Sequence, residues 1–202
     1  MKTLYILLVV MAMFLAGHSQ TAEKLYSDSG NVKIDNQDYK GAIIDFTRVI
    51  EINPNYLYAY FNRGFARSAM QDYRGAIEDY SKAIEVDPSD ALIYYNRGSV
   101  KNKLQDYQAA IVDFNLAIQL NPADERFYGN RGMSKSMLKD YEGALVDFNE
   151  AIQLNPENAL HYYNRGLAEI KLGQKDSGCL DLSKALAMGS EDADKAIMEN
   201  CN

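Results

Sequence analysis

All four prolines of the 202-residue chain lie 34 residues apart, at Pro54, Pro88, Pro122 and Pro156. Four Asn-Arg-Gly triplets keep the same interval and begin at Asn62, Asn96, Asn130 and Asn164. A fixed interval of this length indicates one small structural unit that is copied in tandem and stacked, so that neighbouring copies share a core. The spacing therefore restricts the chain to a repeat architecture.

The first nineteen residues have the pattern of a secretory signal peptide. Lys2 is followed by an apolar run from Leu4 to Gly17, and Gly17 and Ser19 place small residues before a cleavage point at Gln20. The run of about 14 residues is shorter than the roughly 20 that a membrane-crossing helix needs. We therefore expect an exported protein, periplasmic or secreted, with no membrane span after cleavage. An uncleaved N-terminal anchor is the alternative.

The composition is acidic, with a formal net charge of −7 that becomes one unit more negative when Lys2 is removed. An acidic chain repels the phosphate backbone of nucleic acids, and no Lys/Arg cluster offsets this charge, so we expect no nucleic-acid partner. Net charge alone favours a basic partner. Cys179 and Cys201 are the only cysteines, and export allows them to form a disulfide worth roughly 3 kcal/mol. Two separate buried thiols are the alternative.

With proline at position 32 of each copy, the chain divides into five repeats: 23–56, 57–90, 91–124, 125–158 and 159–192. Position 4 is Tyr and position 8 is Gly in all five, and position 24 is Phe, Tyr or Leu. This pattern resembles the tetratricopeptide (TPR) repeat, a helix-turn-helix, and is similar to that of small exported bacterial TPR proteins. The resemblance implies an all-α fold, an α-solenoid or right-handed superhelix of five TPR units. A short lead (20–22) would precede them, and a C-terminal capping helix (193–202) would follow.

The residues themselves also predict two helices per repeat. Asp90 and Asp106 stand where side chains cap free amide groups at the starts of the two helices of the third repeat. Each second helix should end at an Asn-Pro or Asp-Pro step, because proline cannot continue the hydrogen-bond ladder. Gly at position 8 and Ala at position 20 remove bulk where the two helices should cross. The first helix of the first repeat is polar, so we expect it to be frayed or to act as a soluble cap.

Charged residues recur at two positions of the repeat. Position 7 holds the arginines Arg63, Arg97, Arg131 and Arg165. Position 23 holds the aspartates Asp45, Asp79, Asp113, Asp147 and Asp181. We expect these side chains to form structural ion pairs that run through the stack, with a guanidinium bridging two carboxylates. A catalytic role for them is the alternative.

Position 6 holds the four asparagines Asn62, Asn96, Asn130 and Asn164. A carboxamide can both donate to and accept from a peptide backbone. This ladder is similar to the one in the TPR superhelix of O-linked N-acetylglucosamine transferase, and the resemblance implies that positions 2, 5, 6, 9, 12 and 13 line a concave face. We expect that face to bind a protein or peptide through the asparagines and through Phe61, Phe65, Tyr95, Tyr163 and Arg126. Alternatively, the asparagines contact only neighbouring helices, and some of the aromatic residues pack between repeats.

Few residues suggest catalysis. His161 is the only histidine after the predicted cleavage point, and we expect it to be exposed at the surface. No metal-ligand spacing and no Gly-rich phosphate loop is found, so we expect a protein that is not an enzyme and has no cofactor or metal. The Hsp70/Hsp90-binding TPR domains carry Lys at position 5 and Asn at position 9. Here Ser27 and Asn31, or Phe61 and Phe65, occupy those positions, so binding of chaperone tails is not expected.

We expect a non-catalytic scaffold in the cell envelope that binds a protein or peptide of unknown identity in its concave groove. The alternative is a structural subunit of an envelope assembly that binds through its convex or end surfaces and leaves the groove empty. Exposed aromatic residues in the groove would favour the first function. An apolar end at the first repeat or at the capping helix would favour the second.

Overall fold

The computed structural model describes the backbone of residues 2–201 and the side chains of residues 19–201. Within residues 2–201 the chain forms α-helices joined by short turns and contains no strand. It divides into two compact units, Met1–Pro88 and Ser89–Asn202, which we call the N-terminal unit and the C-terminal unit. Among the residues that the structure describes, none of the helices combines the length and apolar character that crossing a bilayer requires.

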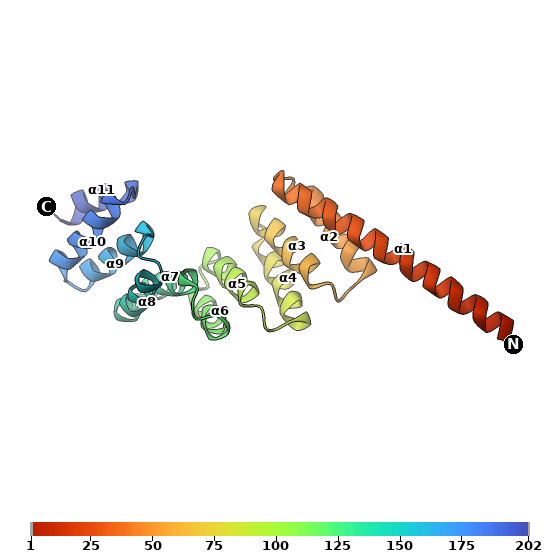
Figure 1. Ribbon diagram of the computed structural model, residues 1–202. Helices are drawn as coiled ribbons and strands as arrows, with labels where there is room; N and C mark the ends of the chain where they lie inside the picture. Colours follow the sequence, from red (N-terminus) through yellow and green to blue (C-terminus); the bar gives the residue numbers. More distant parts are fainter. Residues whose placement is uncertain (1, 202) are drawn as a thin grey trace. The chain divides into compact units, whose positions relative to one another are not determined.

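The N-terminal unit contains α1 (Lys2–Asp35), α2 (Tyr39–Ile52), α3 (Leu57–Ala69) and α4 (Tyr73–Val86). Each helix packs on the next, and α1 also contacts α3, so the unit consists of two stacked hairpins. Figure 1 shows that α1 is one long helix that extends beyond α2. Its backbone runs through the predicted signal peptide and the 20–22 lead into the first repeat, so this helix is not frayed. The side chains of residues 1–18 lie outside the described residues, and cleavage before Gln20 stays a prediction.

The C-terminal unit contains three further hairpins and a last helix. They are α5 (Ala91–Lys103), α6 (Tyr107–Leu120), α7 (Glu125–Met137), α8 (Tyr141–Leu154), α9 (Ala159–Lys171), α10 (Lys175–Ala187) and α11 (Glu191–Asn200). Each hairpin stacks on the next through α6 with α7 and α8 with α9, and α11 packs on α10 and α9. The first helices of the hairpins, α5, α7 and α9, also contact one another in that order. Each unit is therefore an all-α solenoid of stacked helical hairpins, as the resemblance to the TPR repeat implies.

The helix ends of the third repeat lie where the sequence predicts them. The side chain of Asp90 accepts a hydrogen bond from the Leu92 amide (2.8 Å), and that of Asp106 accepts one from the Ala109 amide (3.2 Å). α6 ends at Leu120, and the next residue is extended, with φ −141°, because Pro122 follows one residue later. These caps satisfy amide groups that have no partner inside the first turn of a helix.

Small residues let the two helices of a hairpin approach closely. A Cβ atom added at Gly98 would lie 2.9 Å from the ring of Phe114, and Ala110 on the facing helix is fully buried. The fifth repeat has Gly178 in place of this alanine. There a Cβ atom on Gly166 would lie 2.8 Å from the Gly178 carbonyl oxygen, so the two backbones themselves are in contact. Substitution at either glycine of this repeat would push α9 and α10 apart.

The turn between the two helices of each repeat contains a residue in the left-handed conformation. This residue is Gln37 (φ 60°), Gln71 (φ 64°), Gln105 (φ 62°), Lys139 (φ 65°) or Gly173 (φ 79°). Only the fifth repeat uses glycine, the residue that adopts this conformation without steric strain. The side-chain types in the other four repeats carry no such signal, so the conformation was not predicted.

The capping helix α11 begins at Glu191, two residues before the predicted position. Gly189 has φ 95° and ends the preceding segment, so Ser190 occupies the N-cap position of α11. α11 buries only two alanines, Ala193 and Ala196. Residue 202, the last of the predicted capping segment, lies outside the described residues.

The structure joins Cys179 of α10 to Cys201, directly after α11, in a disulfide with a Cα–Cα distance of 5.8 Å. The bond therefore closes the end of the chain onto the fifth repeat. α11 buries only two alanines, so the disulfide adds a covalent link where the packed surface is small.

Candidate functional site: an ion-pair network and two groove hollows

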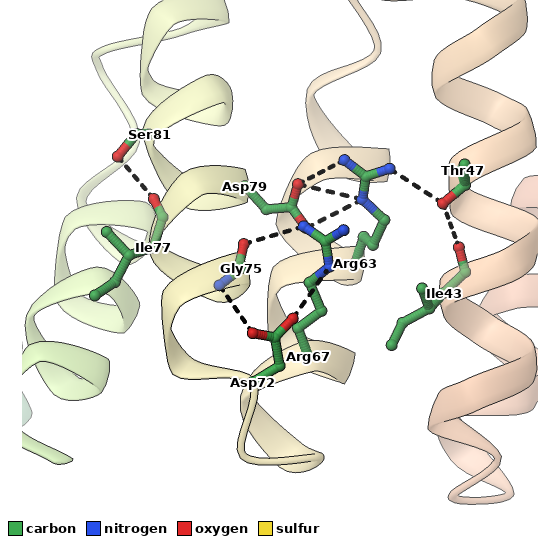
Figure 2. A network of polar contacts seen from close by, with 9 residues as sticks. All are labelled: Ile43, Thr47, Arg63, Arg67, Asp72, Gly75, Ile77, Asp79 and Ser81. Carbon is green, nitrogen blue, oxygen red and sulfur yellow. Dashed lines mark hydrogen bonds and ion pairs between the residues drawn. The ribbon is translucent and has the colours of Figure 1, made fainter. Parts of the chain in front are cut away.

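The network of polar contacts in the second repeat is centred on Asp79 of α4. Arg63 of α3 donates to its carboxylate from Nε (3.0 Å) and Nη2 (2.7 Å). Arg67, one turn later on α3, donates from Nη1 to Asp79 Oδ2 (2.8 Å) and to the Gly75 carbonyl oxygen (3.2 Å). Figure 2 shows the Asp79 carboxylate between these two guanidinium groups. Nη1 of Arg63 donates to Thr47 of α2 (3.1 Å), which links the second hairpin to the first.

The fourth repeat has the same arrangement. Arg131 contacts Asp147 from Nε (2.9 Å) and Nη2 (2.5 Å), and Lys135 contacts the same carboxylate at 2.8 Å. Nη1 of Arg131 donates to Asn115 of the preceding hairpin at 2.6 Å. The prediction that an arginine at position 7 bridges two of the position-23 carboxylates is therefore wrong. In these two repeats the carboxylate instead receives two cations, and the arginine at position 7 contacts the previous hairpin through a neutral side chain.

The predicted pairs of the other repeats are also found, with one variation at each end of the series. Arg97 pairs with Asp113 (2.8 Å), which also receives Lys101 (2.8 Å), and Arg165 pairs with Asp181 (2.5 Å). In the first repeat Asp45 has no arginine at position 7 to contact. Its closest partners are Lys33 and Ser29, both at 2.6 Å, and Arg48 of its own helix lies 4.0 Å away. Burial would raise the pKa of Asp45, but the hydrogen bonds from Lys33 and Ser29 outweigh it and hold that pKa below its ordinary value.

The second cation comes from position 11, which sequence reasoning missed. The residues at this position are Lys33, Arg67, Lys101 and Lys135 in the first four repeats and Glu169 in the fifth. The same 34-residue interval that exposed the arginines would have revealed them. In the fifth repeat burial and the nearby Asp181 carboxylate raise the pKa of Glu169, because two acids face one arginine there.

These contacts make the network structural. The five aspartates are buried, and each of those in the second, third and fourth repeats is neutralised by two basic groups of its own hairpin. Both oxygens of each of these three carboxylates contact basic groups of the same hairpin, so the contacts hold its two helices together. Among the described residues no group of three or more His, Cys, Asp or Glu side chains is arranged to hold a metal ion.

Two hollows lie along the first helices of the C-terminal unit. The α5–α7 hollow has a volume of about 480 Å³ and is lined by Tyr95, Ser99, Asn102, Lys103, Tyr107, Asn130, Met133 and Met137. The α7–α9 hollow has a volume of about 270 Å³ and is lined by Met133, Ser136, Met137, Tyr141, Phe148, Asn164, Leu167, Ala168 and Lys171. Met133 and Met137 of α7 line both, so the two hollows adjoin along one wall. We call them together the groove hollows.

Two predicted binding residues, Tyr95 and Asn130, line the α5–α7 hollow, and a third, Arg126, contacts both of them. The Asn130 carboxamide donates to the Tyr95 hydroxyl (3.4 Å) and to the Arg126 carbonyl oxygen (2.9 Å). The Arg126 guanidinium lies 5.4 Å from the centre of the Tyr95 ring and pairs with Asp124 at 2.5 Å. Tyr95 itself packs against the ring of Phe127, with 5.2 Å between centroids. Tyr95 therefore serves both the core and the surface of the hollow.

The other predicted binding residues of the C-terminal unit are spread along it. Asn164 lines the α7–α9 hollow, and Tyr163 lines a third hollow of about 350 Å³ between α9 and α11. The Asn96 carboxamide donates to the Leu92 carbonyl oxygen of its own helix at 2.7 Å. The asparagines at position 6 thus also contact their own helices, and their role in binding a peptide stays a prediction.

The remaining predicted binding residues belong to the N-terminal unit. Asn62 of α3 donates to Asn31 of α1 at 2.9 Å. Phe65 is 41% exposed and meets Tyr39 edge to face, with 6.3 Å between centroids. Phe61 is half-buried against Tyr80, with 5.8 Å between centroids. Of these three residues, Phe65 presents the most apolar surface to a ligand.

His161 is buried, so the prediction that it is exposed is wrong. Its ring fills the space left by the missing side chain of Gly129 on α7, where a Cβ atom would lie 2.7 Å from Cε1. Nε2 lies 3.2 Å from the Asn158 carboxamide nitrogen, and Nδ1 is buried without a hydrogen-bond partner. Burial lowers the pKa of His161, although the Glu125 carboxylate opposes this shift. The ring is therefore a neutral wedge between α7 and α9.

The chain matches known repeat families over several ranges. Residues 67–105 and 138–173 match the family described as TPR repeat, and residues 91–124 and 23–56 match two families that are both described as tetratricopeptide repeat. No curated protein sequence matches the chain.

Solved structures with a similar fold include MamA, with a TM-score of 0.77 and 26% identity over 86% of this chain and 94% of that one. YrrB, described as a TPR protein with an unusual peptide-binding site, has a TM-score of 0.75 and 19% identity over 86% of this chain and 90% of that one. PilF of Pseudomonas aeruginosa has a TM-score of 0.75 and 19% identity over 86% of this chain and 79% of that one. At 19% identity the last two show the fold alone.

Proposed function

Because the chain belongs to the tetratricopeptide repeat family, we propose that it is a non-catalytic scaffold that binds a protein or peptide in the groove hollows of its C-terminal unit. The observation that carries this proposal is the pair of adjoining hollows between α5, α7 and α9. Apolar, concave surfaces with a few polar groups are typical of ligand sites, because burial supplies affinity and the polar groups fix orientation.

The side chains of the groove hollows suit a peptide. Met133 and Met137 are 39% and 56% exposed, and a flexible thioether adapts to differently shaped apolar partners. Asn130 and Asn164 supply carboxamides, one in each hollow, that can hydrogen-bond a peptide backbone. The C-terminal unit therefore offers both contacts that hold an extended segment, apolar pockets and backbone partners.

We further propose that the protein acts in the cell envelope after export. The charged start, apolar run and small residues before Gln20 support this location. The disulfide between Cys179 and Cys201 also supports it, because disulfides persist mainly in oxidising compartments.

One observation favours assembly through the outer surface as a second function. Position 22 of the second helices is apolar and exposed in three successive hairpins, at Val112 (53%), Val146 (68%) and Leu180 (73%). An apolar row on the outer helices of a scaffold is a feature of interaction surfaces. The groove remains the better-supported site, because it combines hollows with hydrogen-bonding groups.

Selection from a random peptide library displayed on phage tests the groove directly. Peptides selected on the wild-type protein should lose binding to Met137→Glu, which places a charge in the shared wall of both hollows. They should keep binding to Val146→Glu, which adds the same charge at an exposed position of α8. Loss of binding with Val146→Glu and not with Met137→Glu would reject the groove and support the outer surface.

A further inference from the structure

The groove hollows differ in charge from the chain as a whole. Each is lined by one charged side chain, Lys103 in the α5–α7 hollow and Lys171 in the α7–α9 hollow, and by no carboxylate. The chain overall has Asp+Glu 28 against Lys+Arg 21. A lining that is cationic and free of acids is the reverse of what the net charge suggests, so the local field of the groove favours an anionic ligand.

The two hollows are also built alike. Each contains an asparagine from position 6, Asn130 or Asn164, and a tyrosine from position 17, Tyr107 or Tyr141. They share the methionine wall of α7 and lie one repeat apart. The two lysines do not follow this repetition, because Lys103 belongs to α5 and Lys171 to α9, the outer helices of the three. The arrangement indicates two adjacent subsites for one continuous ligand, rather than one pocket for a compact ligand.

The acid-free lining of the groove hollows ends at the third hollow, between α9 and α11. There Asp192 and Glu199 line the surface beside Lys171 and Lys195, so basic and acidic groups alternate. An anionic ligand that follows the groove from α5 toward α11 would meet these two carboxylates. The charge pattern therefore limits the site to the two groove hollows.

We propose that the groove hollows bind an internal protein segment in which apolar and acidic residues alternate. One apolar side chain enters each hollow and contacts the methionine wall, and carboxylates beside it pair with Lys103 and Lys171. The lysines belong to different hollows, so a single C-terminal carboxylate cannot satisfy both, and the segment must carry at least two acidic side chains. This inference rests on the proposed function and names the class of partner for the same site.

Three synthetic peptides of about 12 residues, with both ends blocked and a fluorescein label, test the inference. They carry the same leucines alternating with Glu, Gln or Lys. Fluorescence anisotropy should give a Kd for the Glu peptide about tenfold below that of the Gln peptide, and a weaker Kd still for the Lys peptide. The difference should shrink as salt is raised, because ions screen exposed charge pairs.

Charge-reversal variants separate the groove from the net charge. Lys103→Glu with Lys171→Glu should invert the preference, so that the Lys peptide binds more tightly than the Glu peptide. Lys40→Glu with Arg74→Glu changes the net charge by the same amount at exposed positions of α2 and α4, and it should keep the wild-type preference. Circular dichroism of both double variants confirms that each still folds.

Four outcomes would overturn the inference. The first two are equal Kd values for the Glu and Gln peptides, and no binding of the Glu peptide at about 1 mM. The third is an equal change in peptide preference in the two double variants. The fourth is self-association of the wild-type protein that Lys103→Glu with Lys171→Glu abolishes. The last would identify a second copy of this chain as the occupant.

The phage selection distinguishes this failure from that of the proposed function. Neutral or basic peptides whose binding is lost with Met137→Glu would leave the function standing and reject the acidic segment. Selected peptides of any charge that ignore Met137→Glu would reject the function itself.

Discussion

Asp147 of α8 is 1% exposed and receives two cations from α7, Arg131 and Lys135. If these cations are alternative partners of one buried charge, removing both should destabilise the protein by more than the sum of the single removals. The single variants Arg131→Met and Lys135→Met and the double variant test this, since methionine keeps the apolar stem and removes the charge.

The contacts give the expected magnitudes. Lys135→Met removes one charge-assisted hydrogen bond to Asp147 and should lower the free energy of unfolding by about 1.5 kcal/mol. Arg131→Met removes two such bonds and one to Asn115, and about 3 kcal/mol is expected. In the double variant the carboxylate is buried with no cation, and the loss should exceed the sum by about 1–2 kcal/mol. Arg131→Ala should be worse than Arg131→Met, because it also exposes the Tyr128 ring that lies 5.6 Å from the guanidinium carbon.

Urea unfolding followed by circular dichroism at pH 7 gives the four free energies that the cycle requires. Adding Asp147→Asn to the double variant should recover part of the loss, because the uncompensated charge is removed. Losses that add to within about 0.5 kcal/mol would refute the claim that the two cations share one buried charge.

Three further predictions concern the end of the chain, the buried histidine and the turns. Reduction of the Cys179–Cys201 disulfide should release α11, because this helix buries only two alanines. Amide hydrogen exchange should then become faster in residues 191–200 but not in α7. Unchanged exchange in residues 191–200 would contradict the release of α11. Burial lowers the pKa of folded His161 below the value of about 6.5 expected in the unfolded chain. The contribution of the neutral ring to stability is therefore complete above about pH 6.5 and is lost as the pH falls toward the folded pKa. Stability should therefore fall less steeply between pH 7 and 5 in His161→Gln than in the wild type, and parallel curves would argue against the buried ring. Gln105→Gly removes the steric cost of a left-handed backbone and should raise the free energy of unfolding by up to about 1 kcal/mol. Gln108→Gly, at a helical position of α6, should lower it by about 1 kcal/mol. Changes of the same sign for both variants in thermal melts would reject the left-handed conformation at Gln105.

The sequence was sufficient to predict the helices and their order because each boundary is set by local chemistry. Pro122 ends the second helix of its repeat wherever the chain goes next, and Asp106 caps the start of that helix through an amide three residues away. Aspartates and arginines at fixed positions likewise predicted which side chains form ion pairs. Such features depend on neighbours within one hairpin, and their recurrence every 34 residues makes them recognisable in the sequence.

The misses depend on contacts between hairpins or on backbone geometry. His161 was expected at the surface because a lone histidine usually lies there, but the missing side chain of Gly129, one hairpin earlier, creates the space that its ring fills. The orientation of Arg131 toward Asn115 also depends on how two hairpins stack, so bridging between carboxylates was a wrong prediction. The left-handed Gln105 carries no compositional sign of its conformation.

For the candidate site, the sequence predicted residues without their arrangement. Asn130 and Tyr95 were predicted as binding residues, and the structure brings them to one hollow. Met133 and Met137 stand at positions 9 and 13, which the resemblance assigns to the concave face, but the sequence does not predict that they form one wall shared by two hollows. Its exposure emerges only when α5, α7 and α9 are placed side by side.

The most direct test of the account follows the methionine methyl groups by NMR while a peptide selected on the wild-type protein is added. Met133 and Met137 lie in the groove hollows, whereas Met70 on α3's C-terminal side and Met198 on α11 lie outside them. The account predicts that the Met133 and Met137 signals shift with saturation and that the Met70 and Met198 signals do not. Saturable shifts of Met70 or Met198, with Met133 and Met137 unchanged, would contradict it.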